Sequence, residues 1–261
     1  MSARSGPEEH RRGVGWTLNP GLLTSSTFRY RDRRDAGRAL AARLRGYSGR
    51  EDVIVLALPR GGVPVGFEVA SALRVALDVF LVRKLGVPGH EELAFGAIAS
   101  GGLVALDRDI VRQLSISRAT IERVIAREAA ELARRERAYR DLPPPELRGR
   151  TIILVDDGLA TGSTMLAAAA AVKQEQPARV IVAVPVAAAD TCARLRHEAD
   201  EVICLLTPSP FHAVGIWYED FRPVDDEEVR RLLAAATRPA TRPATRRVDA
   251  TGAPAGKGVS T

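Results

Sequence analysis

The chain of 261 residues is 46% hydrophobic and 27% charged, which suits one mid-sized globular domain with appendages. No apolar run approaches the roughly 20 residues that cross a membrane, and the arginine-rich start lacks the apolar core of a signal peptide. We therefore expect a soluble, cytoplasmic protein without membrane partners.

The net charge of +6 is concentrated at the two ends of the chain. Residues 1–50 carry 11 arginines against 4 acidic residues, residues 237–261 carry 5 basic residues against 1 acidic residue, and the part between has a net charge of −5. A nucleic-acid-binding domain should carry its basic surface on the fold itself, so nucleic acid is not an expected partner. We expect a disordered basic N-terminus over 1–26, one domain over 27–236 and a disordered, low-complexity tail over 237–261.

The two cysteines, Cys192 and Cys204, lack the CxxC spacing of metal sites and redox motifs. Neither a zinc site nor a disulfide framework is therefore expected. Cys204 lies in an apolar run and is predicted to be a small core residue.

The first predicted elements are a helix over Asp35–Leu44, with Asp35 as its N-cap, and a buried strand over Val53–Leu58. A loop follows the strand, and a second helix is expected over Phe67–Leu73. This succession is a strand–loop–helix unit with glycines and one arginine at its turn.

The loop after the first strand contains Arg60, Gly61 and Gly62. Paired glycines let the backbone approach a ligand closely, and the arginine fork suits phosphate or pyrophosphate. The next predicted strand, Asp78–Val82, ends at the basic pair Arg83–Lys84, in which Lys84 is favoured as a second pyrophosphate contact. The alternative interpretation is that both side chains of this basic pair are solvated and contact no ligand.

A hairpin is expected over residues 86–106. His90 and the two glutamates after it could act as a general acid or base, but a solvated loop tip is the favoured interpretation. Ser117–Arg140 is predicted as one long helix with an apolar stripe, in which Glu131 can pair with Arg135. We expect its charges to form a solvated face and not a functional site.

The most informative stretch runs from Thr151 to Met165. A short β-branched run predicts a buried strand, and Asp156 and Asp157 follow it directly. An alanine-rich helix is predicted after the next loop. That loop consists mainly of small and hydroxyl-bearing residues: Gly158, Leu159, Ala160, Thr161, Gly162, Ser163 and Thr164.

A loop of this kind lets successive backbone N–H groups converge on an anion at the N-terminus of the helix, where the helix dipole favours negative charge. Phosphate is therefore the expected ligand. Asp156 and Asp157 would repel it, but they can accept hydrogen bonds from sugar hydroxyls or hold a divalent cation through water. A ribose phosphate with a bound metal supplies the phosphate, the sugar hydroxyls and the divalent cation that these residues would bind. An ordinary turn, with the aspartates capping the helix, is the alternative.

Further strands and helices are predicted at Val180–Val186, Asp190–Ala199, Glu201–Leu206 and Asp225–Leu233. Between the last two, Phe211, Trp217 and Tyr218 stand out in a chain with only 5% aromatic residues. Their rings could form a pocket that stacks on a planar base. The alternative is a lid that buries the sheet edge, which we favour for Trp217.

Strands alternate with helices over residues 52–206. This order predicts an α/β fold with a doubly wound, mostly parallel sheet, a small hairpin hood and flexible termini. The arginine–glycine loop and the acidic pair both follow strands at their carboxyl ends, where open α/β sheets bind ligands.

At these residues the sequence resembles the type I phosphoribosyltransferases. Their signature is an apolar strand, two acidic residues, two or three small or apolar residues, and Thr-Gly-x-Thr. Five positions match it: Asp156, Asp157, Thr161, Gly162 and Thr164. Gly158 stands where many members carry an apolar residue. The resemblance covers about residues 28–234 and extends in particular to a subgroup of predicted phosphoribosyltransferases with undefined acceptors.

The resemblance implies transfer of a 5-phosphoribosyl group from phosphoribosyl pyrophosphate to a small nitrogen acceptor such as a nucleobase. Asp156 and Asp157 would hold the ribose hydroxyls and, through them or through water, Mg²⁺. Residues 158–164 would cradle the 5′-phosphate. The loop Arg60–Gly62 and Lys84 would bind the departing pyrophosphate, with Arg60 and Lys84 neutralising its charge. A homodimer is common in this family.

Two other functions share parts of this pattern. A non-catalytic regulator that senses phosphoribosyl pyrophosphate and binds nucleic acid would draw its support from the basic chain ends alone. A phosphoribosyl pyrophosphate synthetase would need an ATP site, which no sequence feature supplies.

Overall fold

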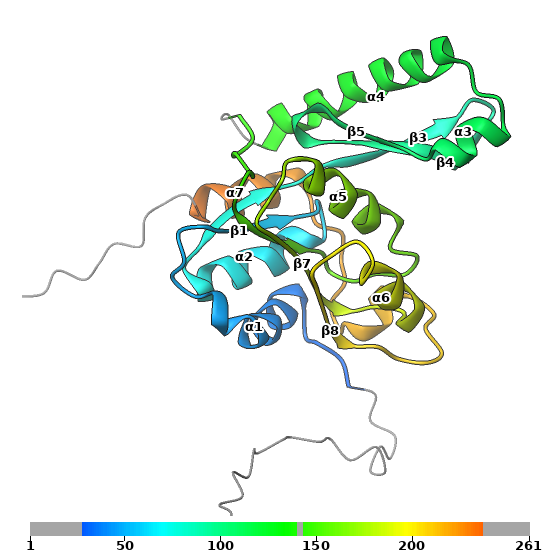
Figure 1. Cartoon of the computed structure of the whole chain (residues 1–261). Coiled ribbons are helices and arrows are strands. Elements are labelled where there is room, and N and C mark those ends of the chain that lie inside the picture. The colour runs from blue at the N-terminus through cyan, green and yellow to red at the C-terminus, as the bar shows by residue number, and fades with distance from the viewer. Residues whose placement is uncertain (1–27, 140–142, 237–261) are drawn as a thin grey trace, which may run out of the picture.

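A computed structural model describes residues 28–139 and 143–236 (Figure 1). The predicted disordered ends, 1–26 and 237–261, lie outside the described residues. Five strands form a parallel sheet in the order β2-β1-β6-β7-β8, which confirms the predicted fold class. They are β1 (Val53–Ala57), β2 (Ala76–Val79), β6 (Thr151–Val155), β7 (Arg179–Val186) and β8 (Glu201–Leu206).

Helices cover both faces of this sheet (Figure 1). On one face, Val53 and Val55 of β1 pack with residues of α1 (Arg33–Arg43) and α2 (Gly62–Leu73). On the other face, Ile54 and Leu56 pack with α5 (Ser163–Gln174) and α6 (Ala189–Leu195). Successive side chains of a strand point to opposite faces, so a strand buried on both sides reads as a continuous apolar run.

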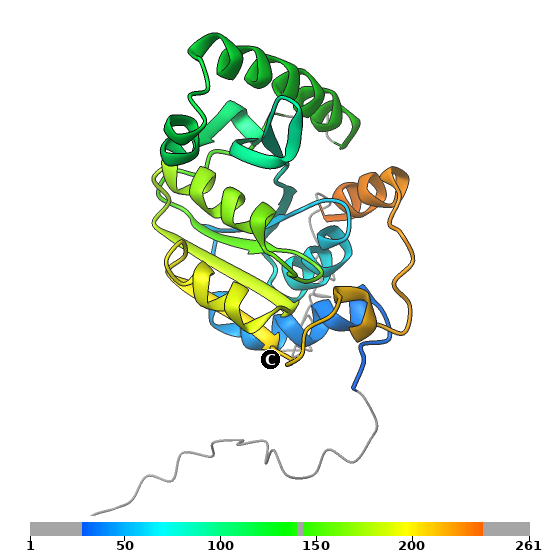
Figure 2. The same cartoon turned by 90° about the vertical axis from the view of Figure 1, so that its right-hand side faces the viewer.

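The chain between β2 and β6 forms a separate hood above one end of the sheet (Figures 1 and 2). It contains the antiparallel strands β3 (Val82–Val87), β4 (His90–Ala99) and β5 (Leu103–Leu106), followed by α3 (Arg108–Gln113) and α4 (Arg118–Tyr139). Phe95 and Leu85 of the hood sheet are fully buried in one cluster with Leu132 of α4. The last helix, α7 (Asp226–Ala236), contacts both α2 and α4. The described residues also contain three short 3-10 helices: Arg45–Tyr47, Ser100–Gly102 and Val214–Trp217.

The predicted cap of the first helix was wrong. Asp32 is the N-cap of α1, and its carboxylate accepts a hydrogen bond of 2.7 Å from the backbone N–H of Asp35. Asp35 instead lies in the first turn, where a negative charge is favoured by the helix dipole. Asp32 and Asp35 are both able to cap a helix, and the hydrogen bond from the N–H of Asp35 to the carboxylate of Asp32 identifies Asp32 as the cap.

Two other predicted boundaries also moved. The helix expected from Phe67 begins at Gly62, because Pro64 falls in its first turn, where proline needs no N–H partner. The strand expected over Asp78–Val82 is divided, since β2 ends at Val79 in the parallel sheet and β3 begins at Val82 in the hood.

The expectation that the cysteines are unpaired was also wrong. Cys192 of α6 and Cys204 of β8 form a disulfide. The helix crosses the sheet face next to that strand, so two residues without a recognisable spacing meet across the packed layers. The described part of the chain contains no helix with the length and apolar character needed to span a bilayer.

Candidate active site

The two loops singled out in the sequence lie side by side. Strands β1 and β6 are neighbours and pair in register at Ala57 and Val155, so the loops that follow them meet at one edge of the sheet. A Cβ atom on Gly61 would collide with the carboxylate of Asp157. On Gly62 it would lie 2.8 Å from the carbonyl oxygen of Val155. The close packing of the two loops therefore requires the paired glycines.

Asp157 is held by residues from both ends of the domain. The Nε of Arg33 donates a hydrogen bond of 2.7 Å to its carboxylate, and the hydroxyl of Tyr218 donates one of 2.5 Å to its backbone carbonyl. The guanidinium of Arg33 also donates to the carbonyl of Arg222 at 2.8 Å and stacks 3.9 Å from the ring centre of Phe221. Sequence reasoning missed Arg33, which is 124 residues from its partner and has no local motif.

The surroundings of the acidic pair oppose ionisation. Burial raises the pKa of Asp156 well above its ordinary value, and the neighbouring charge of Asp157 raises it further. Burial also raises the pKa of Asp157, but the hydrogen bond and charge of Arg33 act against this rise. Asp156 also accepts a 2.8 Å hydrogen bond from the backbone N–H of Asp157. The two carboxyls are therefore inequivalent, with Arg33 supporting the charge on Asp157.

The predicted phosphate cradle forms the entry to α5. Gly162 is its N-cap and has a φ of 67°, in the left-handed region that glycine tolerates. A side chain here would also collide with Thr191. Thr191 of α6 donates a hydrogen bond of 2.6 Å to the carbonyl of Ala160, so α6 supports the loop from behind.

The hydroxyl-bearing residues of the cradle lie at its open end. Thr161 and Thr164 are exposed, and the hydroxyls of Thr161 and Ser163 are 3.3 Å apart. Leu159 instead buries its side chain in the core and donates its backbone N–H to Val186 at 2.9 Å. The cradle therefore combines one anchoring residue with exposed hydroxyl donors at a helix N-terminus.

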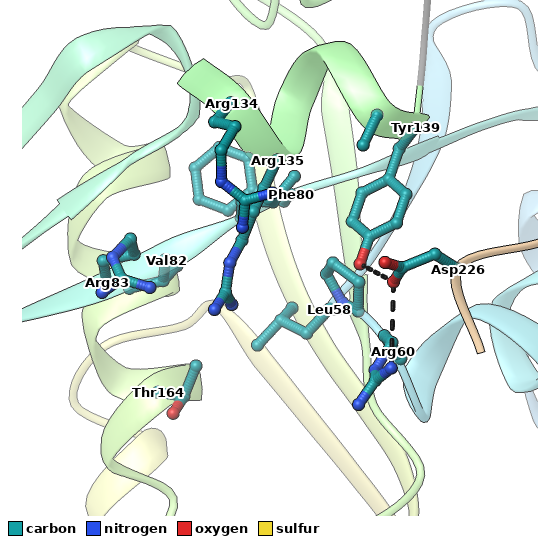
Figure 3. A pocket seen from close by; sticks show the side chains of 13 residues that line it. Leu58, Arg60, Phe80, Val82, Arg83, Arg134, Arg135, Tyr139, Thr164 and Asp226 are labelled. Carbon is teal, nitrogen blue, oxygen red and sulfur yellow. Dashed lines mark hydrogen bonds and ion pairs between the residues drawn. The ribbon is translucent and has the colours of Figure 1, made fainter. Parts of the chain in front are cut away.

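An arginine-lined cavity of about 270 Å³ lies between the end of β1, the first turn of α5 and the overhanging α4 (Figure 3). Arg60 and Tyr139 line it, and Thr164 of the cradle faces it (Figure 3). Asp226 accepts a 2.7 Å hydrogen bond from the hydroxyl of Tyr139 and lies 3.9 Å from Arg60. Burial and this hydrogen bond raise the pKa of Tyr139 to about 12, so its hydroxyl stays protonated.

The structure brings Arg83, and not the predicted Lys84, to this cavity. Both residues lie on β3, where successive side chains face opposite sides. Among the described residues that line the cavity, Arg83 is present and Lys84 is absent, and Lys84 is exposed. The basic pair was recognised in the sequence, but the register of a strand decides which member points inward.

The expectation of a solvated charged face on α4 holds for Arg134 and Arg135, whose side chains are 65% and 49% exposed. It was wrong for Glu128, which is buried and pairs with Arg83 at 2.5 Å. Arg134 and Arg135 both line the cavity, and both donate to Glu131. The predicted pair of Glu131 and Arg135 is confirmed, with a separation of 2.9 Å.

The aromatic residues after β8 pack around the last strands. Tyr218 is 3% exposed, with its ring stacked on Phe221. Trp217 and Phe211 are half-buried and pack against the same cluster, which includes Val186. This packing matches the alternative of a lid over the sheet edge. A base-stacking role for Phe211, Trp217 and Tyr218 stays a prediction.

The acidic pair has the donor chemistry that Mg²⁺ prefers. Mg²⁺ is held through one or two carboxylates and takes its other ligands from substrate oxygens and water. Within the described ranges, no cluster of three or more His, Cys, Asp or Glu side chains could hold a metal ion. Asp156 and Asp157 fit a Mg²⁺ ion that takes its remaining ligands from substrate oxygens and water.

Comparison with known proteins found a matching family, similar sequences and a similar solved structure. The model of the Phosphoribosyl transferase domain family matches residues 29–218. Two proteins of Mycobacterium tuberculosis, from strains CDC 1551 and H37Rv, are provisionally named as phosphoribosyl transferases. Each is 48% identical over 208 residues, which is 79% of this chain and 47% of the relative. The chain thus spans about half the length of these curated relatives. The crystal structure of TT1426 from Thermus thermophilus is 46% identical and has a TM-score of 0.72, over 80% of this chain and 99% of its own.

Proposed function

This chain belongs to the phosphoribosyl transferase family, and we propose that it transfers a 5-phosphoribosyl group from phosphoribosyl pyrophosphate to a nitrogen acceptor, with release of pyrophosphate. One observation carries this proposal. The acidic pair, the helix-entry loop that follows it and the arginine–glycine loop meet at one sheet edge, where Gly61 and Gly62 pack against Asp157 and Asp156. A diol, a phosphate and a pyrophosphate on one ligand match these three elements.

Different residues of the chain would bind different parts of the ligand. Asp156 and Asp157 would accept hydrogen bonds from the ribose hydroxyls, and residues 158–164 would bind the 5′-phosphate. Arg60 would neutralise the pyrophosphate. No protein nucleophile is needed, because these groups would stabilise positive charge on the ribose and negative charge on the leaving group in the transition state. Mg²⁺, when bound, would act as a Lewis acid towards the pyrophosphate.

The test is calorimetric titration of phosphoribosyl pyrophosphate with Mg²⁺ into the wild type and into the Asp156→Asn/Asp157→Asn variant. We expect micromolar binding by the wild type and a loss of at least about tenfold in the variant, since charge-assisted hydrogen bonds contribute roughly 1.5–3 kcal/mol each. A circular dichroism spectrum checks that the variant is folded. Equal binding by both proteins would contradict the proposed site. A screen of nucleobases for pyrophosphate release then seeks the acceptor.

The second candidate function is a non-catalytic regulator that senses phosphoribosyl pyrophosphate. A measurement of catalytic turnover distinguishes it from the enzyme. Asp157→Asn should depress turnover strongly while leaving the fold intact. A protein that binds phosphoribosyl pyrophosphate but releases no pyrophosphate with any nitrogen acceptor would favour the regulator.

A further inference from the structure

Two side chains of α6 hold backbone carbonyls of the helix-entry loop. The hydroxyl of Thr191 donates a hydrogen bond of 2.6 Å to the carbonyl of Ala160. The guanidinium of Arg194 donates one of 3.4 Å to the carbonyl of Thr161. The carbonyl and the N–H of a planar trans peptide point in opposite directions. The N–H groups of Thr161 and Gly162 therefore point away from α6, as a loop that binds an anion through its backbone requires.

Helix α6 is fastened to the parallel sheet by a covalent bond. It contains seven residues, and helices shorter than about 12–15 residues are marginal without packing. Three of its side chains are buried: Thr191, Cys192 and Leu195. Cys192 forms a disulfide with Cys204 of β8, which lies beside α6 (Figure 1). The residue that holds the loop thus directly precedes the residue that fastens the helix.

A dithiol can open this bond at its more accessible sulfur. Cys204 is half-buried on β8, which is the last strand of the described parallel sheet, whereas Cys192 is 2% exposed. A thiolate of the reductant bonds to the Sγ of Cys204, the disulfide breaks, and the Sγ of Cys192 leaves and takes up a proton. The second thiol of the reductant then displaces Cys204. Two electrons and two protons pass to the cysteines, and the reductant leaves as a cyclic disulfide.

We propose that the Cys192–Cys204 disulfide is a redox switch that acts on the helix-entry loop through α6, with Thr191 as the positioning residue. In the oxidised protein, α6 is fixed against β8 and Thr191 holds the carbonyl of Ala160. In the reduced protein, packing alone holds α6, so this hydrogen bond is formed in only a fraction of the molecules. The affinity for a sugar phosphate falls by that fraction. The inference rests on the proposed function for its ligand, the 5′-phosphate.

The first measurement is calorimetric titration of ribose 5-phosphate into the oxidised wild type and into the wild type reduced with dithiothreitol. Ellman's reagent counts the thiols of the denatured protein, which has two cysteines: none should react before reduction and two after it. We expect reduction to weaken binding about two- to tenfold, the range that one neutral hydrogen bond contributes. Cys204→Ser should bind as the reduced wild type does, with or without dithiothreitol.

Variants of Thr191 test whether its hydroxyl carries the coupling. Thr191→Val keeps the disulfide and the shape of the side chain, so it should bind weakly and show no response to reduction. Thr191→Ser restores the hydroxyl and should restore both the affinity and the response. Thr151→Val is the matched control, because Thr151 is also 3% exposed but begins β6, at the end of the strand away from the loop. It should behave as the wild type.

Amide hydrogen exchange tests the coupling without a ligand. The backbone N–H of Leu159 donates to the carbonyl of Val186, and that of Leu166 donates to the carbonyl of Gly162. Reduction should speed the exchange of both amides. The amide of Thr151, which donates to the carbonyl of Asp52 at 2.9 Å, should be unaffected.

Three results would overturn the inference: two reactive thiols before reduction, equal affinities of the oxidised and reduced wild type for ribose 5-phosphate, or exchange that rises as much at Thr151 as at Leu159 and Leu166. If the oxidised protein binds no ribose 5-phosphate, the proposed function is contradicted. The exchange at Leu159 and Leu166 then decides by itself whether the disulfide acts on the loop.

Discussion

Asp156 and Asp157 lie where ionisation is costly, yet the proposed chemistry needs their charge. Burial removes them from water, and each lies next to the other's charge. Such sites often reduce stability in favour of function. Arg33 offsets part of this cost at Asp157 and leaves Asp156 as the more strongly perturbed carboxyl.

The raised pKa of Asp156 predicts a pH-dependent gain in stability on its removal. The folded state binds the proton of the Asp156 carboxyl more tightly than the unfolded chain does. The contribution of this proton to folding stability is therefore complete below the unfolded pKa near 3.8 and is lost as the pH rises through the folded-state pKa. Asp156→Asn should therefore melt above the wild type at pH 8. We expect roughly 2–4 °C, the shift that about 1 kcal/mol gives in a domain of this size. The gain should shrink towards pH 4.

Asp52→Asn is the control for this measurement. A side-chain hydrogen bond from Arg50 lowers the pKa of Asp52, so its charge favours the folded state above the unfolded pKa. Its replacement should give no gain at pH 8. An equal rise in melting temperature for both variants would show that the effect comes from net charge and not from the burial of Asp156.

Sequence reasoning located the acidic pair but could not find Arg33. The pair can be recognised from the local sequence, because it lies between an apolar strand and a hydroxyl-rich loop. Arg33 is one of 11 arginines in the first 50 residues, and only the packing of α1 beside the sheet distinguishes it from the others. Long-range side-chain pairs leave no local pattern, and the same holds for Cys192 and Cys204.

At the level of elements, the site consists of two strand–loop–helix units placed side by side. Each unit was predicted from the sequence, and the pairing of β1 with β6 brings their loops into contact. The predicted boundaries were weaker, because Gly and Pro residues in the first turn of α2 resemble a loop in sequence. The inward member of the Arg83–Lys84 pair also depends on strand register, which the local pattern leaves open.

Gly61→Ala tests the contact between the two loops. Its Cβ would displace the carboxylate of Asp157 from its place beside Arg33, so the affinity for phosphoribosyl pyrophosphate should fall at least about tenfold, as for the loss of a charge-assisted hydrogen bond. Gly46→Ala is the matched control, since a Cβ there meets nothing within 4 Å. Calorimetry on both variants gives the comparison. Equal affinities would mean that Asp157 can move without loss of binding.

In the molecule as a whole, the sheet and the hood supply different parts of the site. The sheet edge carries the acidic pair and the cradle. Arginines of α4 and β3 line the neighbouring cavity, which Thr164 of the cradle also faces (Figure 3). The hood's antiparallel hairpin was expected from the sequence. The buried Glu128 of α4 was assigned to solvent with its neighbours, because the sequence of a charged helix does not show which of its charges another strand will cover.

Removal of residues 1–26 and 237–261 tests the basic chain ends. All residues assigned to the site lie between Arg33 and Asp226, so the shortened protein should bind phosphoribosyl pyrophosphate within about twofold of the full chain, a change well below the roughly 1.4 kcal/mol that corresponds to tenfold. Binding to single-stranded RNA and duplex DNA is measured in parallel. Loss of nucleic-acid affinity with catalysis retained would make such binding a secondary property. Loss of phosphoribosyl pyrophosphate binding would show that the ends belong to the site.

The support of Asp157 by distant segments has a consequence for how the protein is made. Tyr30 pairs with Tyr218 in a parallel bridge, and the backbone N–H of Glu219 donates to the carbonyl of Tyr30 at 2.8 Å. Arg33 reaches Asp157 beside this bridge and also binds the carbonyl of Arg222. A ribosome that has released the acidic motif has already released Arg33, but not yet Tyr218, whose hydroxyl binds the carbonyl of Asp157. Nascent chains arrested before Tyr218 should contain the signature loop without a finished site, and binding should appear only with the last segment of the domain.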